Sequence, residues 1–162
     1  MVEIRAFPVS RRETVSSVSR KEGLMLNART AMAERAILLA VSADLNDSKA
    51  LAAILENWTI ERVPTCAEAL AALHRSKCAA ILCEKDLPDG SWRDLLAKMP
   101  HVGEEPPVIV MSRVADETLW VEVLEHGGFD LLTKPLESAE VRRVMVCASG
   151  NRRPRYAVAR AC

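Results

Sequence analysis

Five short strand-forming runs, each followed by a stretch with helical spacing, constrain the fold of this chain more than any other feature. Runs such as AILLAV and VIVM have no polar interruption, which is typical of strands covered on both faces in a parallel sheet. The strands are expected at 36–41, 59–63, 79–83, 108–111 and 130–132, and the helices at 44–57, 65–75, 91–99, 116–126 and 138–149.

This alternation predicts a flavodoxin-like α/β fold, a doubly wound (βα)5 three-layer sandwich with helices on both faces of a parallel sheet. We expect one such domain over residues 35–150. Residues 1–34 are rich in Ser and Arg without periodicity and are predicted to be a disordered basic extension. Residues 151–162 are predicted to be a basic C-terminal tail. Met32 offers an alternative start of translation.

Charge is unevenly distributed, although the chain is neutral as a whole. Residues 32–149 carry 19 acidic and 12 basic side chains, whereas residues 1–31 have a net charge of +3 and residues 150–162 of +4. Basic tails can contact nucleic acid or anionic lipid, but the same composition is typical of solubilising, disordered ends. The acidic core, which has no basic helix, is not expected to bind nucleic acid.

The cysteines and the hydropathy pattern indicate the cellular compartment of the protein. The five cysteines include no C-x-x-C pair, and no apolar run of about 18 residues is present to span a bilayer. We therefore expect a cytoplasmic protein without membrane insertion. A flavodoxin-like cofactor binder is a remote alternative, because the loop VSADLND after the first strand has no glycine to cradle a phosphate.

Doubly wound folds place their sites beyond the carboxyl ends of the strands. Three residues with complementary chemistry follow the strands here. Glu84 supplies a carboxylate, Ser112 a hydroxyl and Lys134 an ammonium, and the bond between Lys134 and Pro135 is a candidate cis peptide. A carboxylate could accept a phosphoryl group while a hydroxyl and a cation hold its oxygens, so this set suits phosphate chemistry.

The segments ILCEKDLPDG, VIVMSR and GGFDLLTKPL, at these spacings, resemble the receiver domain of two-component response regulators. The resemblance covers residues 36–149. It implies a five-stranded sheet in the order 2-1-3-4-5. It also implies that a histidine kinase donates a phosphoryl group to an aspartate of the domain, with Mg²⁺ bound.

This sequence departs from the family at the positions that carry the chemistry. The acceptor aspartate is replaced by Glu84, four residues before Pro88. The acidic pair that ends the first strand falls on Val41 and Ser42, and the aromatic switch position falls on Leu131. The hydroxyl and the lysine of the family are kept as Ser112 and Lys134.

Mg²⁺ binding is not expected in this site. The ion requires several oxygen ligands in near-octahedral geometry, and the loss of the acidic pair leaves Glu84 as the only carboxylate at an expected ligand position. Asp44 and Asp86 are weak candidates to replace the missing ligands. Asp44 is explained more simply as the N-cap of the helix over 44–57.

Three hypotheses for the function follow. In the first, this is a stand-alone pseudo-receiver that acts by protein–protein interaction and has lost self-phosphorylation. The fixed charge of Glu84 would then either mimic part of a phosphoryl group or be an inert relic that pairs with Lys134. In the second, a working receiver accepts a phosphoryl group from a histidine kinase through a non-standard acidic site. The third is the cofactor binder.

The expected partner is a histidine kinase or a downstream output protein, because the few residues after Gly150 cannot fold into an output domain. Trp120 and Leu124 mark the expected partner face, formed by the helix at 116–126, the strand at 130–132 and the helix at 138–149. A tryptophan there would be a natural hot spot, although packing against the core also explains Trp120. A homodimer through the same face is an alternative.

Overall fold

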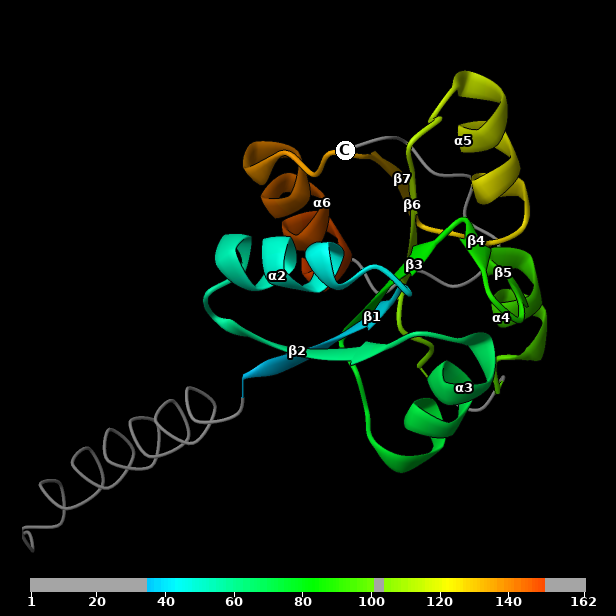
Figure 1. Cartoon of the computed structure of the whole chain (residues 1–162), viewed down its shortest axis with the longest axis horizontal. Coiled ribbons are helices and arrows are strands. Elements are labelled where there is room, and N and C mark those ends of the chain that lie inside the picture. Colours follow the sequence, from blue (N-terminus) through cyan, green and yellow to red (C-terminus); the bar gives the residue numbers. More distant parts are fainter. Residues whose placement is uncertain (1–34, 101–103, 151–162) are drawn as a thin grey trace, which may run out of the picture. The chain divides into compact units, whose positions relative to one another are not determined.

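Five parallel strands form a single sheet in the order β2-β1-β3-β6-β7, which confirms the predicted fold and strand order (Figure 1). The computed structural model describes residues 35–100 and 104–150, so the predictions for residues 1–34 and 151–162 lie outside the described residues. The strands are β1 (Ala36–Val41), β2 (Trp58–Val63), β3 (Ala80–Glu84), β6 (Val108–Ser112) and β7 (Asp130–Thr133).

Five helices within the described residues cover the two faces of this sheet (Figure 1). Buried residues of α3, α4 and α5 pack on one face, and those of α2 and α6 pack on the other. The helices are α2 (Leu45–Ile54), α3 (Cys66–Arg75), α4 (Trp92–Lys98), α5 (Glu117–Glu125) and α6 (Ser138–Gly150).

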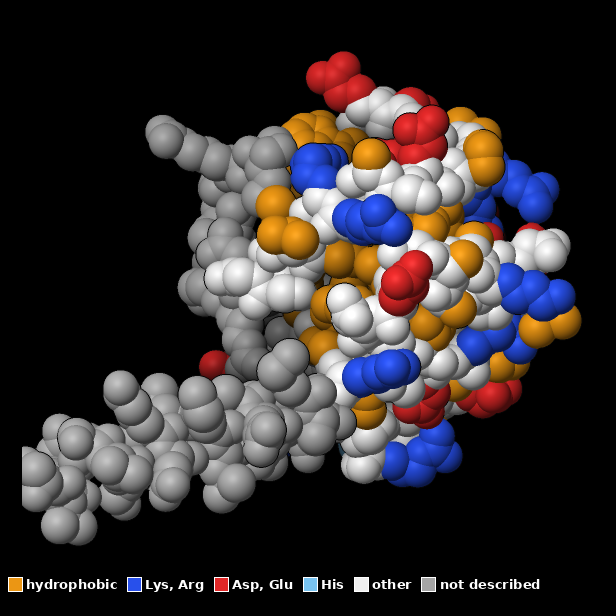
Figure 2. Space-filling view, turned by 90° about the vertical axis from the view of Figure 1, so that its left-hand side faces the viewer, with side chains coloured by type: hydrophobic (Ala, Val, Ile, Leu, Met, Phe, Trp, Pro, Cys, Tyr) orange, Lys and Arg blue, Asp and Glu red, His pale blue; other side chains and the backbone are white. Residues whose placement is uncertain are grey.

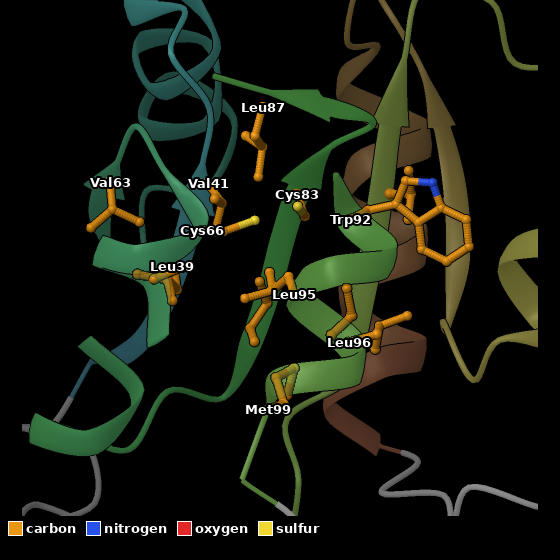
Figure 3. Packing of buried hydrophobic residues seen from close by; sticks show 14 of the residues in the cluster. Leu39, Val41, Val63, Cys66, Cys83, Leu87, Trp92, Leu95, Leu96 and Met99 are labelled. Carbon is orange, nitrogen blue, oxygen red and sulfur yellow. The ribbon is translucent and has the colours of Figure 1, made fainter. Parts of the chain in front are cut away.

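Successive side chains of a strand point to opposite faces of the sheet, so each strand contributes side chains to both layers of the core. In β1, Leu39 and Val41 join the cluster under α3, α4 and α5, whereas Leu38 and Ala40 join the cluster under α2 and α6. This explains the continuous apolar run that the sequence shows. Figure 3 shows the first cluster. Its labelled side chains are Leu39, Val41, Val63, Cys66, Cys83, Leu87, Trp92, Leu95, Leu96 and Met99.

Two local features differ from the predicted elements. β3 runs one residue further than the predicted strand, so that Glu84 is its last residue rather than the first residue of the loop. After it, Asp86–Leu87 (β4) pairs antiparallel with Gly90–Ser91 (β5) in a small hairpin. The carboxylate of Asp89 in this hairpin accepts hydrogen bonds from the amides of Cys66 and Ala67, which ties the loop to the start of α3.

Within the described residues, no helix is long and apolar enough to cross a membrane. A groove of about 500 Å³ lies between α2 and α6. The residues that line it include Ile54, Trp58, Met145 and Val146. Figure 2 shows the face of the domain that lies on the left in Figure 1, where hydrophobic side chains are exposed between basic and acidic ones. Since Trp58 is the first residue of β2, the groove lies towards the amino ends of the strands, away from the edge where Glu84 ends β3.

Candidate functional site

The register of the sheet brings the predicted site residues to one edge. Glu84 pairs in register with Met111, and Ser112 with Thr133, so β3, β6 and β7 end at neighbouring positions. The amide of Lys134 donates to the carbonyl of Ser112 at 2.9 Å, which fixes the start of the loop after β7. The peptide bond between Lys134 and Pro135 is cis.

The centre of the site is one ammonium between two carboxylates. The Nζ of Lys134 donates to Oε2 of Glu84 and, at 2.6 Å, to Oδ2 of Asp47. All three side chains are largely withdrawn from solvent, with exposed fractions of 8% for Lys134, 9% for Asp47 and 20% for Glu84. Such charge-assisted hydrogen bonds are strong because little water competes for them.

Asp47 was not predicted as a site residue. It lies in the first turn of α2, where a negative charge also suits the helix dipole. The hydroxyl of Ser42 donates to Oδ2 of Asp47 at 2.5 Å and accepts from the amide of Asp44 at 3.1 Å. Ser42 therefore orients the Asp47 carboxylate towards Lys134. One sequence signal could have found it, since Asp44 and Asp47 both stand at the helix start and only one of them can be the cap.

The pKa values in the cluster follow from burial and from the shared ammonium. Burial raises the pKa of Glu84 above its ordinary value, and the carboxylate of Asp47 adds to this, while Lys134 opposes it. Burial by itself would lower the pKa of Lys134, but the hydrogen bonds to Asp47 and Glu84 outweigh it and raise that pKa. Lys134 is therefore held as a cation, and the two carboxylates compete for it.

The other predicted residues take different places. The hydroxyl of Ser112 is buried and is hydrogen-bonded to the carbonyl and the amide of Val114, at 2.9 and 3.2 Å. Val41 is buried in the core beneath the site. Leu131 is buried in β7, and its side chain packs in the same cluster.

The hydrogen bond and ion pairs of the two weak metal-ligand candidates lie outside the cluster of Asp47, Glu84 and Lys134. Asp44 is the N-cap of α2, as predicted, and its carboxylate accepts from the amide of Asn46 at 2.9 Å, which lowers its pKa. Arg113 lies 3.8 Å from the same carboxylate. Asp86 is an exposed residue of the β4–β5 hairpin and lies 4.0 Å from the ammonium of Lys85.

The charges present do not fit a divalent cation. Within residues 35–100 and 104–150, no three His, Cys, Asp or Glu side chains gather as metal ligands would. The two carboxylates that do converge both face the ammonium of Lys134, which is itself a cation. A Mg²⁺ ion placed there would meet a like charge and would lack the several oxygen ligands it needs.

The predicted partner face is built from α5, β7 and α6. Trp120 is half-buried against the core, and its indole Nε1 donates to Oδ1 of Asp130 at 3.1 Å, which joins α5 to the start of β7. Leu124 is also half-buried, one turn further along α5. Val121, beside Trp120, is the more exposed apolar side chain of this helix, with an exposed fraction of 41%.

Comparison with known proteins matches this sequence and fold to one family. The family model of the response regulator receiver domain matches residues 42–145. The response regulator protein PilR of Pseudomonas aeruginosa is 30% identical over 87 residues, which are 54% of this chain and 20% of PilR. The response regulator protein TodT of Pseudomonas putida is 28% identical over 69 residues, which are 43% of this chain and 30% of TodT.

A solved structure agrees with these matches. The crystal structure of a two-component response regulator from Clostridium difficile superposes with a TM-score of 0.61 at 27% identity. The superposition covers 70% of this chain and 94% of that one. The matched part of this chain is thus close to the whole of that structure, whereas it spans less than a third of the length of PilR or TodT.

Proposed function

The chain belongs to the response regulator receiver domain family of two-component signalling, and from that premise we propose that it is a receiver that acts without being phosphorylated. It works by binding another protein, and its self-phosphorylation activity is lost. One observation carries this proposal. The residue at the acceptor position, Glu84, is already paired with the ammonium of Lys134, which is shared with Asp47.

The geometry of Glu84 supports the loss of phosphoryl transfer. Its side chain is one methylene longer than that of the family's aspartate, and misplacing a reacting group by about 1 Å can slow a reaction on the order of 10²-fold. The absence of the acidic pair at Val41 and Ser42 removes two metal ligands as well. The hydroxyl of Ser112, which would bind phosphoryl oxygens, is hydrogen-bonded within its own loop to Val114.

The fixed charge of Glu84 can act in two ways. In the first, Glu84 is a permanent partial mimic of the phosphoryl group, because one negative charge stands where a phosphoryl group would bring about −1.5 to −2. In that form, Glu84 and Lys134 hold the face of α5, β7 and α6 in its partner-binding shape. In the other form the pair is a relic, and the face has that shape without it.

A mass measurement tests the central claim. The protein is incubated with acetyl phosphate and Mg²⁺ and weighed intact, with a receiver that keeps the family's aspartate as the positive control. We expect the mass to stay unchanged. A stable gain of about 80 Da that disappears in Glu84→Gln would overturn the proposal and would favour the working receiver, in which a non-standard acidic site containing Glu84 accepts the phosphoryl group.

A second measurement separates the mimic from the relic. The chain is immobilised, and a partner is recovered from native cells and identified by mass spectrometry; a histidine kinase or an output protein is expected. If Glu84 is a mimic, Glu84→Gln weakens that binding, because the site loses its fixed charge. Equal binding by the variant and the wild type identifies the relic.

A further inference from the structure

Asp47 gives Lys134 a second anionic partner that no position of the sequence motif assigns. Its Oδ2 lies 2.6 Å from Nζ of Lys134 and 2.5 Å from Oγ of Ser42, while the same Nζ also donates to Glu84. The residues come from separate elements of the fold. Asp47 is on α2, Glu84 ends β3, and Lys134 follows β7.

We propose that Asp47 and Glu84 together form a cation-binding site whose resident cation is the ammonium of Lys134, and that Asp47 is the positioning residue that holds Lys134 there. The inference deepens the proposed function and rests on it in one respect, namely that the site does not work through a metal. It adds that the ammonium of Lys134 stays bound between Asp47 and Glu84.

Because the site is buried, its carboxylates need a cation in direct contact, and the covalently attached ammonium of Lys134 supplies it. The side chains of Asp47 and Lys134 are each more than nine-tenths withdrawn from solvent, so neither charge can rely on water. An ammonium has three N–H donors, and two of these are directed to the two carboxylates. The hydroxyl of Ser42 uses the same Oδ2 of Asp47 and so fixes the direction in which that carboxylate points.

A tethered ammonium differs from a bound metal ion in what it permits. It cannot leave the site by dissociation, and its charge is +1 rather than +2, so the cluster of Asp47, Glu84 and Lys134 keeps a net charge of −1. A free divalent ion has to displace Lys134 before it can reach both carboxylates. The site of this protein is consequently closed to divalent ions by one of its own side chains.

Amine labelling tests the role of Asp47 directly. Asp47→Asn keeps the shape of the side chain and removes its charge. The folded proteins are treated with an N-hydroxysuccinimide ester of acetic acid, and labelling of each lysine is followed by peptide mass mapping. We expect labelling of Lys134 to rise about tenfold in Asp47→Asn, as the loss of a charge-assisted hydrogen bond implies.

Two controls make this test specific. Labelling of Lys77, which is exposed, should be the same in the wild type and in the variant. Asp86→Asn removes an exposed carboxylate of the nearby hairpin and should leave Lys134 as protected as in the wild type. Unchanged protection of Lys134 in folded Asp47→Asn would overturn the proposal.

Cation binding provides an independent test, with Mn²⁺ as the probe and electron paramagnetic resonance to measure the free ion. We expect no saturable binding by the wild type, saturable binding by Lys134→Met, and loss of that binding when Asp47→Asn is added. Saturable binding by the wild type, or none by folded Lys134→Met, contradicts the proposal. If Lys134→Met does not fold, the amine labelling of Lys134 in Asp47→Asn still tests the proposal by itself. Phosphoryl uptake by the wild type would overturn the proposed function without altering either readout for Asp47.

Discussion

The Nζ of Lys134 and the Oδ2 of Asp47 lie 2.6 Å apart, although the two residues are 87 positions apart in the sequence. This contact links the first turn of α2 to the loop after β7, across the strand that ends in Glu84. Because Glu84 shares the same ammonium, the cluster joins three elements at the edge of the sheet where the family places its chemistry. Substitutions of these three residues can therefore measure how much the cluster contributes to the free energy of unfolding.

Lys134→Met should lower the free energy of unfolding by about 3 kcal/mol, because it leaves the two carboxylates of Asp47 and Glu84 in a poorly solvated site without their counter-ion. Adding Asp47→Asn to Lys134→Met should recover part of this loss, since one of the two unpaired charges is then removed. The coupling between the two substitutions should be about 1–3 kcal/mol. Urea denaturation of the wild type, both single variants and the double variant measures it.

Asp86→Asn is the matched control for this cycle. Asp86 is an exposed carboxylate on the hairpin that follows Glu84, so its substitution should change the free energy of unfolding by no more than about 0.5 kcal/mol. Strictly additive effects of Lys134→Met and Asp47→Asn would mean that the 2.6 Å contact contributes nothing of its own.

The raised pKa of Glu84 predicts a pH dependence of stability. A carboxyl group whose pKa is higher in the folded state than in the unfolded state binds its proton more tightly when folded. Its contribution to stability is therefore fully present below the ordinary pKa of 4.5 and is lost as the pH rises through the higher folded value. Burial is the main cause, and Asp47 adds to it.

Glu84→Gln removes this titration and so isolates it. The free energy of unfolding of the wild type, relative to Glu84→Gln, should increase as the pH is lowered towards 4.5 from the range just above it. Urea denaturation of both proteins at a series of pH values measures the difference. A difference that is flat across this range, or that shrinks on acidification, would contradict the raised pKa.

The fold was accessible from the sequence because each strand and helix has its own local signal. The apolar runs, the cap at Asp44 and the helical spacing were sufficient to predict five β–α units, and the resemblance to receivers supplied the strand order that the sheet confirms. The hairpin of β4 and β5 was missed because two-residue strands carry no periodicity.

The site was only partly accessible, for a physical reason. Glu84 and Lys134 follow strands, and the convergence of strand ends in a parallel sheet brings them together. Asp47 lies within a helix start, where an acidic residue is ordinarily explained by the helix dipole. Only the packing of α2 on the sheet shows that its carboxylate is buried against Lys134 and Ser42. The sequence shows only that Asp44 and Asp47 both stand at the helix start, where one cap is needed, and does not show that Asp47 reaches Lys134.

Gly128→Ala tests how tightly the turn between α5 and β7 is packed. A Cβ at this position would lie 2.5 Å from Cγ1 and 2.8 Å from the carbonyl oxygen of Val123, and the backbone oxygen cannot move aside cheaply. We expect a loss of about 1–3 kcal/mol in the free energy of unfolding. Thermal or urea unfolding measures it.

Gly150→Ala is the natural comparison, because no heavy atom of residues 35–100 and 104–150, apart from its chain neighbours and the backbone of its own helix, lies within 4 Å of the Cβ that it would add at the end of α6. Its effect should stay within about 0.5 kcal/mol. If both glycine variants are equally stable, the turn at Gly128 relaxes to admit the methyl group, and the packing against Val123 is looser than the structure indicates.

Val121→Glu tests the proposed partner face. Val121 is an exposed apolar residue of α5 beside Trp120, and a charge there should weaken partner binding about tenfold while leaving the fold intact. Val146→Glu is the matched control, since Val146 is exposed on α6 but lines the groove next to α2 instead. Binding of the partner recovered from native cells is compared for the wild type and both variants. The two substitutions introduce the same charge and differ only in where they place it. Loss of binding in Val146→Glu with full binding in Val121→Glu would therefore show that the partner binds at the groove and not at the face of α5, β7 and α6.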